Sequence, residues 1–463
     1  TIPMMLKRGF TKVFAGGVES AASSGGSIMP PIMGVAAFVM AALTGVPYKD
    51  IVIGAAIPAL IYFACLFLSV VFQSRKQNIG AVGEFTDDMR LTRHEKFHLV
   101  QIFAPIVLIL ILLLTPKDGI GCGPVSQLLG SQIQTTGDVC QVIENPWIVQ
   151  LFQNAAGDAS AAGWWATILL LCLMFLDKDI RSKPKKILDG LSEAGLTVSK
   201  LYLMFLAVTV IDVSLNFTGL ANFLAIDILS YLKSFDIGNG DVAFQLFALF
   251  MTMGLAVLLG MGMPAVPAYI NVALLMGPLL VGLGIATFTA HMFIFYFAVA
   301  SAITPPVALA AFAATTITNA NPMATAFSAV KSGIVMFIIP FAFAIYPELL
   351  LIEQAVIDPT VTGGKTFLPG YDGEIHIEWL LLLLGRLFLS LYLLSTSLAA
   401  FDRSSLSLAE ISVRLVLAAL IMFKPTEIYA AASLAGLLLL VFHYIKNKTV
   451  IPLNKEIPAR QSA

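Results

Sequence analysis

The chain has 463 residues, of which 58% are hydrophobic and 12% are charged. Soluble domains carry roughly 25% charged residues, so this composition, with a mean hydropathy of +0.89, excludes a water-soluble globule. The formal net charge of −1 argues against a nucleic-acid partner and against a polybasic lipid anchor. The composition therefore predicts an all-α polytopic membrane protein whose surroundings are the lipid bilayer.

Apolar runs long enough to cross a hydrocarbon core recur along the chain. The regular runs lie at 51–72, 97–115, 162–176, 201–220, 333–350, 378–400 and 427–444. Less regular apolar stretches at 11–43, 241–316 and 409–423 bring the expected total to about ten or eleven spans.

The basic residues of the first half indicate the topology. Lys and Arg are frequent in the loops at 73–96 and 178–200, whereas the loop 116–161 contains one Lys and no Arg. The positive-inside rule places the two basic loops in the cytoplasm and the loop 116–161 outside. Cys122 and Cys140 share that outer loop, where an oxidising compartment would allow a disulfide; two free thiols are the alternative.

Two short motifs repeat at a fixed offset. Ile28-Met29-Pro30-Pro31 and Ile303-Thr304-Pro305-Pro306 are 275 positions apart (303 − 28). The same offset relates these pairs: Pro3 and Pro278, Gly9 and Gly284, Ala15 and Ala290, Ala36 and Ala311. The alternative is that an apolar chain uses Gly and Pro often enough to give such matches. We favour a true internal repeat, as found in many secondary transporters.

The charges that flank the repeats predict opposite orientations. Lys7, Arg8 and Lys12 place the start of 11–43 in the cytoplasm, so this segment runs outward. The equivalent segment 284–316 starts beside a lysine-poor stretch and ends before Lys331, so it runs inward. The sequence therefore predicts inverted repeats with discontinuous helices and re-entrant hairpins.

Four regions follow from the repeat. Residues 1–96 hold the end of the first repeat with its broken helix 11–43, and residues 97–200 hold connecting spans. Residues 201–350 form the second repeat, with a hairpin at 241–282 and a broken helix at 284–316, and residues 351–463 form C-terminal spans and a cytoplasmic tail. The hairpin's counterpart would lie before residue 1, so we expect an N-terminally truncated chain.

The breaks themselves are the candidate sites. In Ser23–Pro31, two glycines and two prolines interrupt a helical pattern and leave carbonyl and N–H groups without helical partners. Carbonyl and serine oxygens suit a small hard cation such as Na⁺, and the positive end of the next half-helix suits a carboxylate. Ala298–Pro306 repeats the arrangement with Ser301 and Thr304. A packing kink is the alternative for either break.

Ionisable residues within spans are functional candidates. Glu19 lies one turn before the first break and is interpreted as a coupling or positioning group, or as a structural hydrogen-bonding residue. Asp212 and His291 favour structural or interfacial roles, and Arg386 is expected to pair with Glu378 or to snorkel. The chain has no P-loop, H-E-x-x-H or G-x-S-x-G motif, so no catalytic residue is predicted and an ion gradient is the expected energy source.

Three long motifs resemble a known family. They are Gly17-Val-Glu-Ser-Ala-Ala-Ser-Ser-Gly-Gly-Ser-Ile-Met-Pro-Pro-Ile-Met-Gly34, Gly260-Met-Gly-Met-Pro264 and Phe295-Tyr-Phe-Ala-Val-Ala-Ser-Ala-Ile-Thr-Pro-Pro-Val-Ala-Leu-Ala-Ala-Phe312. Together they resemble the large permease subunit of tripartite ATP-independent periplasmic (TRAP) transporters, and most closely that of the TAXI branch.

The resemblance implies Na⁺-coupled, elevator-type uptake across the inner membrane of a bacterium or archaeon. Its expected partners are an extracytoplasmic binding protein and a small membrane subunit, fused upstream or separate. The expected substrate is an organic acid of the dicarboxylate, 2-oxoglutarate or glutamate type, and no cofactor is expected. The alternatives are an ion channel, a symporter outside this family that needs no binding protein, or a structural partner of another permease.

The resemblance also assigns residues to sites by position. One cation site would comprise Gly25, Gly26, Ser27, Ile28 and Pro30 together with the first hairpin. The other would comprise Gly260, Gly262, Ser301, Thr304 and Pro306. The predicted substrate-binding residues are Ser23, Ser24, Pro264 and Thr304.

Overall fold

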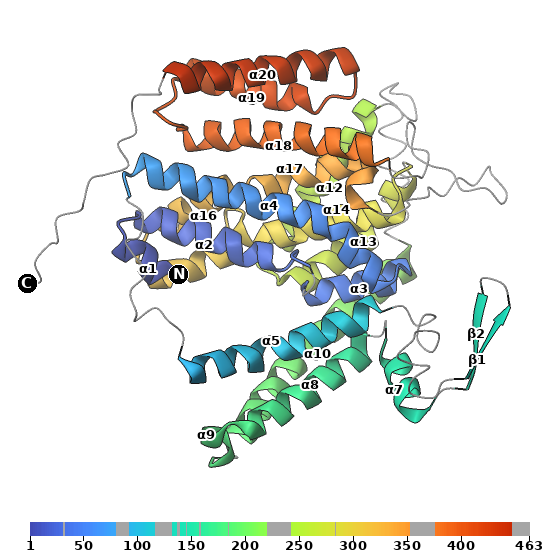
Figure 1. The fold of residues 1–463 in the computed structure, drawn as a ribbon. Helices are drawn as coiled ribbons and strands as arrows, with labels where there is room; N and C mark the ends of the chain where they lie inside the picture. The colour runs from blue at the N-terminus through green and yellow to red at the C-terminus, as the bar shows by residue number, and fades with distance from the viewer. Residues whose placement is uncertain are drawn as a thin grey trace, which may run out of the picture. The chain divides into compact units, whose positions relative to one another are not determined.

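The structure is a computed structural model that describes residues 1–30, 33–79, 92–115, 132–136, 139–144, 146–156, 159–183, 185–219, 242–282, 284–351 and 376–446 (Figure 1). The chain divides into two compact units. Unit 1 comprises Thr1–Ala36, Ile53–Val82 and Val208–Ala463, and unit 2 comprises Ala37–Val52 and Gly83–Ala207. Each unit is described below by itself.

The N-terminal part of unit 1 contains α1 (Ile2–Lys7), α2 (Lys12–Gly26) and most of α4 (Tyr48–Lys76). Helix α2 begins after Thr11, whose hydroxyl accepts a hydrogen bond from the Phe14 N–H at 3.4 Å. This N-cap satisfies one of the backbone donors that the first turn of a helix leaves free.

A second group of helices in unit 1 surrounds the later repeat motif. Its elements are α12 (Val242–Gly260), α13 (Ala265–Gly282), α14 (Thr287–Ala300), η3 (Ser301–Ile303), α15 (Leu309–Thr318), α16 (Pro322–Ser332), α17 (Val335–Ile345) and η4 (Pro347–Leu350). Helices α12 and α13 contact each other and both contact α14, whose 14 residues are almost all buried.

The boundaries of these helices follow the offset seen in the sequence. Lys12 and Thr287, which begin α2 and α14, are separated by that offset, and so are Lys7 and Gly282, which end α1 and α13. Gly9 and Gly284, also one offset apart, both have positive φ values of 99° and 83°. A residue with a Cβ rarely adopts such values, so both positions demand glycine for the turn.

The C-terminal helices of unit 1 form a layered group (Figure 1): α18 (Ile377–Ala399) contacts α19 (Leu408–Ile421), which contacts α20 (Thr426–Lys446). Arg414 of α19 is fully buried and donates hydrogen bonds to Asp402 at 3.1 Å and to the Thr396 hydroxyl at 2.7 Å. Removing either member of a buried pair leaves an uncompensated charge, so this pair fixes how α18 and α19 pack.

Arg386 of α18 forms no ion pair with Glu378 among the described residues, so the first of its two predicted roles is wrong. Its guanidinium donates to the carbonyl oxygens of Ile421 and Phe423 at 2.8 and 2.9 Å and lies 3.6 Å from the centroid of the Tyr429 ring. The carbonyls at the end of α19 lack helical donors, so they attract the cation.

Unit 2 contains α5 (Arg93–Leu114), β1 (Gln132–Thr136), β2 (Val139–Glu144), α7 (Trp147–Ala155), α8 (Ala159–Leu176), α9 (Lys178–Arg181), most of α3 (Val35–Thr44) and most of α10 (Lys185–Thr218). Helices α5 and α8 contact each other, and β1 pairs with β2 in antiparallel register. This small hairpin in the loop 116–161 is a β element that the sequence did not predict. Cys122 lies outside the described residues and the side chain of Cys140 is not described, so the disulfide stays a prediction.

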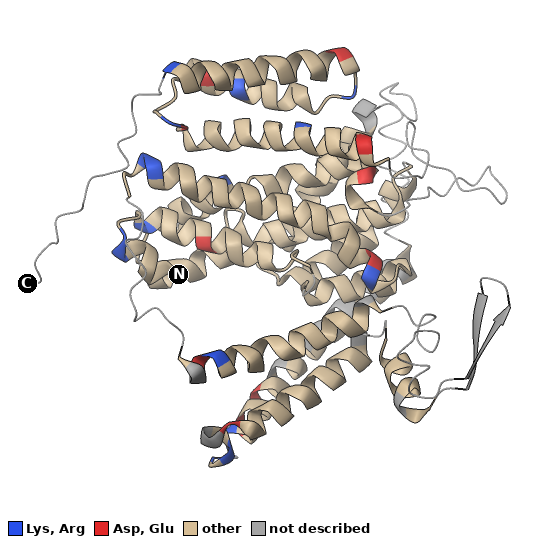
Figure 2. Cartoon of the chain, viewed as in Figure 1, with Lys and Arg blue, Asp and Glu red and all other residues tan. Residues whose placement is uncertain are grey.

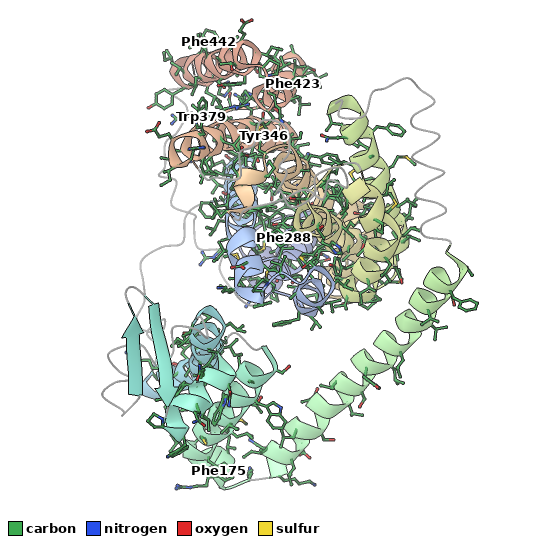
Figure 3. The ribbon with its side chains drawn as sticks, turned by 90° about the vertical axis from the view of Figure 1, so that its right-hand side faces the viewer. Phe175, Phe288, Tyr346, Trp379, Phe423 and Phe442 are labelled. Carbon is green, nitrogen blue, oxygen red and sulfur yellow. The ribbon has the colours of Figure 1, made fainter. Side chains whose placement is uncertain are left out.

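The outer surface is apolar, as a lipid environment requires. Trp379 and Phe442 are each 65% exposed, whereas Phe288 is buried within unit 1 (Figure 3). Among the described helices, six are long and apolar enough to cross a membrane: Tyr48–Lys76, Glu95–Leu113, Ala265–Gly282, Pro322–Ile345, Ile377–Ala399 and Thr426–Lys446. Soluble monomers rarely expose this much apolar surface, and together with the six helices it confirms the prediction of an all-α multi-pass membrane protein.

Candidate functional site

The first helix break follows α2 and is held by hydrogen bonds between its own backbone groups. The N–H groups of Ser27 and Ile28 donate to the carbonyls of Ser24 and Gly25, each at 3.1 Å, which tightens the last turn. The carbonyl of Ser27 then accepts the N–H of Gly34 at 2.8 Å, just before α3 begins at Val35. The backbone oxygen of Ser27 therefore already has one partner, and a carbonyl oxygen can accept a second.

Tyr62 of α4 supports this first break, and sequence reasoning missed it. Its hydroxyl donates to the Ala21 carbonyl at 2.8 Å, and its ring fills the space that a Cβ on Gly25 would occupy. The hydroxyl also lies 3.2 Å from the position of a Cβ on Gly333. A lone tyrosine within an apolar helix was the available signal, but its partners come from distant segments.

The second break lies between α14 and α15 and meets the tip of the α12–α13 hairpin. The Ser301 hydroxyl lies 2.7 Å from the Ala298 carbonyl oxygen and 3.1 Å from that of Gly260, so its proton bridges the break and the tip. A Cβ on Gly260 would lie 2.7 Å from the Cβ of Ser301, closer than carbon atoms approach. Glycine at this position is therefore required for the contact.

Thr304 and Gly262 complete the neighbourhood of the second break. The Thr304 hydroxyl donates to the Ala300 carbonyl at 2.7 Å, so its lone pairs remain available as acceptors. Gly262 has φ +80°, and the nearest atom to a Cβ there would be the Val307 Cγ1 at 3.8 Å. Gly262 is thus required for its backbone conformation rather than for space, whereas Pro264 and Pro306 are exposed.

Asn271 of α13 is a second residue that sequence reasoning missed. Its amide oxygen is buried and has no hydrogen-bond partner in the described part of the chain. Its amide nitrogen lies 3.9 Å from the sulfur of Met263, in the linker between α12 and α13. A buried carbonyl oxygen without a donor is unfavourable by about 1–3 kcal/mol, and a cation would satisfy it. Asparagine in an apolar helix was the only sequence signal.

Helix α2 contacts both η3 and α15, so the segments that carry the two breaks meet. The Ser20 hydroxyl lies 3.1 Å from the carbonyl oxygen of Ala310. Of the predicted substrate residues, Ser24 is buried and Ser23 is exposed on α2. No hydrogen bond joins either serine to Thr304 within the described residues, so their joint role in substrate binding stays a prediction.

Glu19 accepts a hydrogen bond from the Thr1 hydroxyl and is half-buried. This contact is a structural role of the kind that the sequence left open, and it leaves the coupling role untested. His291 of α14 lies with its Nδ1 2.7 Å from the Tyr269 hydroxyl of α13, so it links the hairpin to the helix that precedes the second break.

Comparison with known protein families shows which family this chain belongs to. Residues 1–356 match the family model for the DctM component of tripartite ATP-independent periplasmic transporters. The chain belongs to the DctM family. The match includes both breaks and the α12–α13 hairpin, whereas α18, α19 and α20 follow it. DctM proteins are permease components of secondary transporters, so the chain is a transporter subunit. A search of curated proteins finds no match.

Proposed function

We propose that this DctM-family permease carries out Na⁺-coupled uptake of a small organic acid delivered by an extracytoplasmic binding protein. The observation that carries the proposal is the contact between the second break and the hairpin tip, through the Ser301 hydroxyl and the Gly260 carbonyl at 3.1 Å. It gathers oxygen atoms from two separate segments without any cationic side chain among the residues involved.

The second break offers the better-defined cation site. The hydroxyl oxygens of Ser301 and Thr304 donate their protons to backbone carbonyls, so their lone pairs can face a cation. The Asn271 oxygen, which has no hydrogen-bond partner among the described residues, adds a neutral ligand atom from α13 of the same hairpin. Neutral oxygen donors of this kind suit a monovalent hard cation, and backbone carbonyls of Gly260, Gly262 and Pro306 would supply the remaining ligands.

At the first break, the proposed Na⁺ ligands are the backbone oxygens of Gly25, Gly26, Ser27, Ile28 and Pro30 together with the Ser27 hydroxyl. The tight turn at the end of α2 brings successive carbonyls to one end of the helix, where the macrodipole is negative. A cation there is stabilised by this dipole as well as by direct ligation.

The substrate is proposed to be a dicarboxylate, 2-oxoglutarate or glutamate, as in the TAXI branch. The N-termini of α3 and α15 carry positive partial charge, and Ser23, Ser24, Pro264 and Thr304 lie on or beside the breaks. Two bound cations and two helix dipoles would together offset the charge of a dianion, which explains how the site could bind one without Lys or Arg.

Membership of the DctM family supports the proposed partners, which are the binding protein and the small membrane subunit. The basic residues of unit 1 support an inner-membrane orientation with the start of α2 and the end of α4 in the cytoplasm. Lys7, Arg8, Lys12, Arg75 and Lys76 all gather at that end (Figure 2).

The decisive experiment is uptake by proteoliposomes that contain the permease, its small subunit and the binding protein. We expect uptake of a labelled dicarboxylate to rise with an inward Na⁺ gradient and to vanish without the binding protein. Uptake that ignores the Na⁺ gradient would contradict the coupling, and uptake without a binding protein would contradict the tripartite mechanism. Ohmic currents in planar bilayers would instead indicate a channel.

A further inference from the structure

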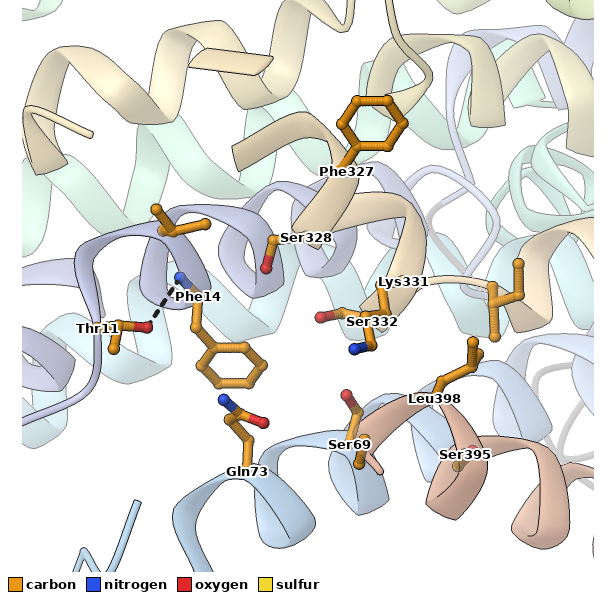
Figure 4. A pocket seen from close by; sticks show the side chains of 13 residues that line it. Thr11, Phe14, Ser69, Gln73, Phe327, Ser328, Lys331, Ser332, Ser395 and Leu398 are labelled. Carbon is orange, nitrogen blue, oxygen red and sulfur yellow. Dashed lines mark hydrogen bonds between the residues drawn. The ribbon is translucent and has the colours of Figure 1, made fainter. Parts of the chain in front are cut away.

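A cavity lies in unit 1 at the end of α2 opposite the first break. Its volume is about 260 Å³, and it is enclosed by the start of α2, the last turns of α4, helix α16 and the end of α18 (Figure 4). The start of α2 lies about 20 Å along the helix axis from Gly26, because each residue adds about 1.5 Å. None of the residues of the proposed cation and substrate sites lines the cavity, although Gly333, between the lining residues Ser332 and Ile334, lies close to Ile303 of η3.

On α4 and α16, the cavity is lined by hydrogen-bonding side chains that have no hydrogen-bond partner among the described residues. Ser69 and Gln73 come from α4, and Ser328, Lys331 and Ser332 come from α16. Ser332 is only 6% exposed, and its hydroxyl makes no hydrogen bond to any described residue. Its hydroxyl can therefore donate a hydrogen bond to a ligand in the cavity.

The cavity is electropositive. The Lys331 ammonium lines it and forms no ion pair within the described residues. A second ammonium lies beside it, because Lys76 donates to the carbonyl of Ala399 at 2.7 Å and Ala399 lines the cavity. Thr11, at the positive N-terminal end of α2, contributes a third source of positive potential, and none of the described lining residues is Asp or Glu. The expected ligand is therefore an anion.

Apolar side chains from the same helices also line the cavity, and one of them reaches the outer surface. Phe14 and Leu398 line the cavity, and Phe327, also in the lining, is 61% exposed. The cavity lies at the end of unit 1 where basic residues gather, which the positive-inside rule assigns to the cytoplasmic leaflet. A phospholipid meets such an environment at the level of its headgroup: cationic and hydrogen-bonding groups contact the phosphate, and exposed apolar side chains contact the acyl chains.

We propose that this cavity binds the phosphodiester headgroup of an anionic phospholipid from the cytoplasmic leaflet. The Lys331 ammonium pairs with the phosphate, the hydroxyls of Ser332 and Ser69 donate to its oxygens, and an acyl chain lies along Phe327. The bound lipid would connect α2 and α16 to α4 and α18, segments that are distant in the sequence.

Native mass spectrometry of the full-length protein tests the proposal, with phosphatidylglycerol and phosphatidylcholine as the probes. We expect phosphatidylglycerol to bind at least tenfold more tightly, and Lys331→Gln to remove about that factor, which is the ratio given by ~1.4 kcal/mol. Ser332→Ala should weaken phosphatidylglycerol binding by a smaller factor. Lys331→Arg keeps the positive charge and should retain most of the wild-type affinity.

Lys446→Gln is the matched control, because Lys446 is exposed in the last turn of α20 and does not line the cavity. It should leave lipid binding unchanged. Equal affinity for both lipids, or equal losses in Lys331→Gln and Lys446→Gln, would overturn the proposal. Displacement of phosphatidylglycerol by millimolar inorganic phosphate would also overturn it, because the ligand would then be a soluble anion. If Lys331→Gln does not fold, Ser332→Ala provides the comparison, and affinity equal to that of Lys446→Gln would overturn the proposal.

Discussion

The two helix breaks share a sequence pattern but differ in what holds them. At the first break, the Ser27 carbonyl accepts the Gly34 N–H at 2.8 Å, so the backbone closes the loop. At the second, the Ser301 side chain bridges to Gly260 at the tip of the α12–α13 hairpin. The pattern of glycine and proline therefore determines that a helix breaks, and the neighbouring segments determine how the break is supported.

The glycines beside the breaks show the same difference. Gly25 is tight against the ring of Tyr62, a rigid side chain on α4, whereas Gly260 is tight against the side chain of Ser301 within the proposed cation site. Both glycines belong to proposed cation sites, but a substitution at the first should lower stability most, because it displaces a rigid ring, and one at the second should lower transport most, because it displaces a proposed ligand. The following predictions test this comparison.

The largest effect is expected for Gly260→Ala. The new Cβ would lie 2.7 Å from the Cβ of Ser301, so the hairpin tip must move away from the break. The added methyl group should destabilise the contact at the proposed cation site by about 1–3 kcal/mol. We therefore expect uptake in proteoliposomes to fall at least tenfold. Gly254→Ala in the same helix has open space around its Cβ and should retain full uptake. Wild-type uptake in Gly260→Ala would refute the assigned contact.

Gly25→Ala is expected to act mainly on stability. The Cβ would overlap the Tyr62 ring, and we expect a loss of about 1–3 kcal/mol in the free energy of unfolding. Gly26→Ala, with no atom within 4 Å of its Cβ, should be neutral or slightly stabilising. Thermal unfolding in detergent measures both variants. Similar melting temperatures for the two would show that the Tyr62 contact does not constrain the first break.

Asn271→Leu separates cation binding from folding. If the buried amide oxygen is a Na⁺ ligand, the variant should raise the Na⁺ concentration for half-maximal uptake several-fold, while its stability in Na⁺-free buffer stays equal or rises. Tyr269→Phe, which removes a hydroxyl from the same helix that bonds to His291, is the control and should leave the Na⁺ dependence unchanged. An unchanged Na⁺ dependence in Asn271→Leu would exclude this ligand.

The smallest effects should distinguish the two serines. Ser301→Ala removes a side-chain hydrogen bond, so it should lower the free energy of unfolding by about 0.5–1.5 kcal/mol, whereas Ser27→Ala leaves the backbone bond to Gly34 intact and should lower it less. Ser27→Ala and Thr304→Ala should both raise the Na⁺ concentration for half-maximal uptake more than they lower expression. Unchanged Na⁺ dependence in both would refute the predicted cation sites.

The sequence alone was sufficient for the class of protein and for the approximate places where α2, α12 and α14 are interrupted. Low charge and long apolar runs require a membrane environment, because backbone groups in lipid must bond within their own helix. Glycine and proline act locally, so the turns at Gly9, Gly284 and Gly262 were predictable from their positions in the chain. The β1–β2 hairpin was not, because a short pair of strands in a polar loop has no strong periodic pattern.

Only the tertiary structure decided which groups meet. Three contacts join segments separated by many residues: the ring of Tyr62 against Gly25, the hydrogen bond from Ser301 to Gly260, and the binding of Arg386 to the end of α19. The structure also shows that the buried oxygen of Asn271 has no hydrogen-bond partner among the described residues. Residue type limits what a side chain can bind, but its partner depends on how whole helices pack. For that reason the sequence located the two breaks, and the three-dimensional arrangement showed that a hairpin tip covers the second.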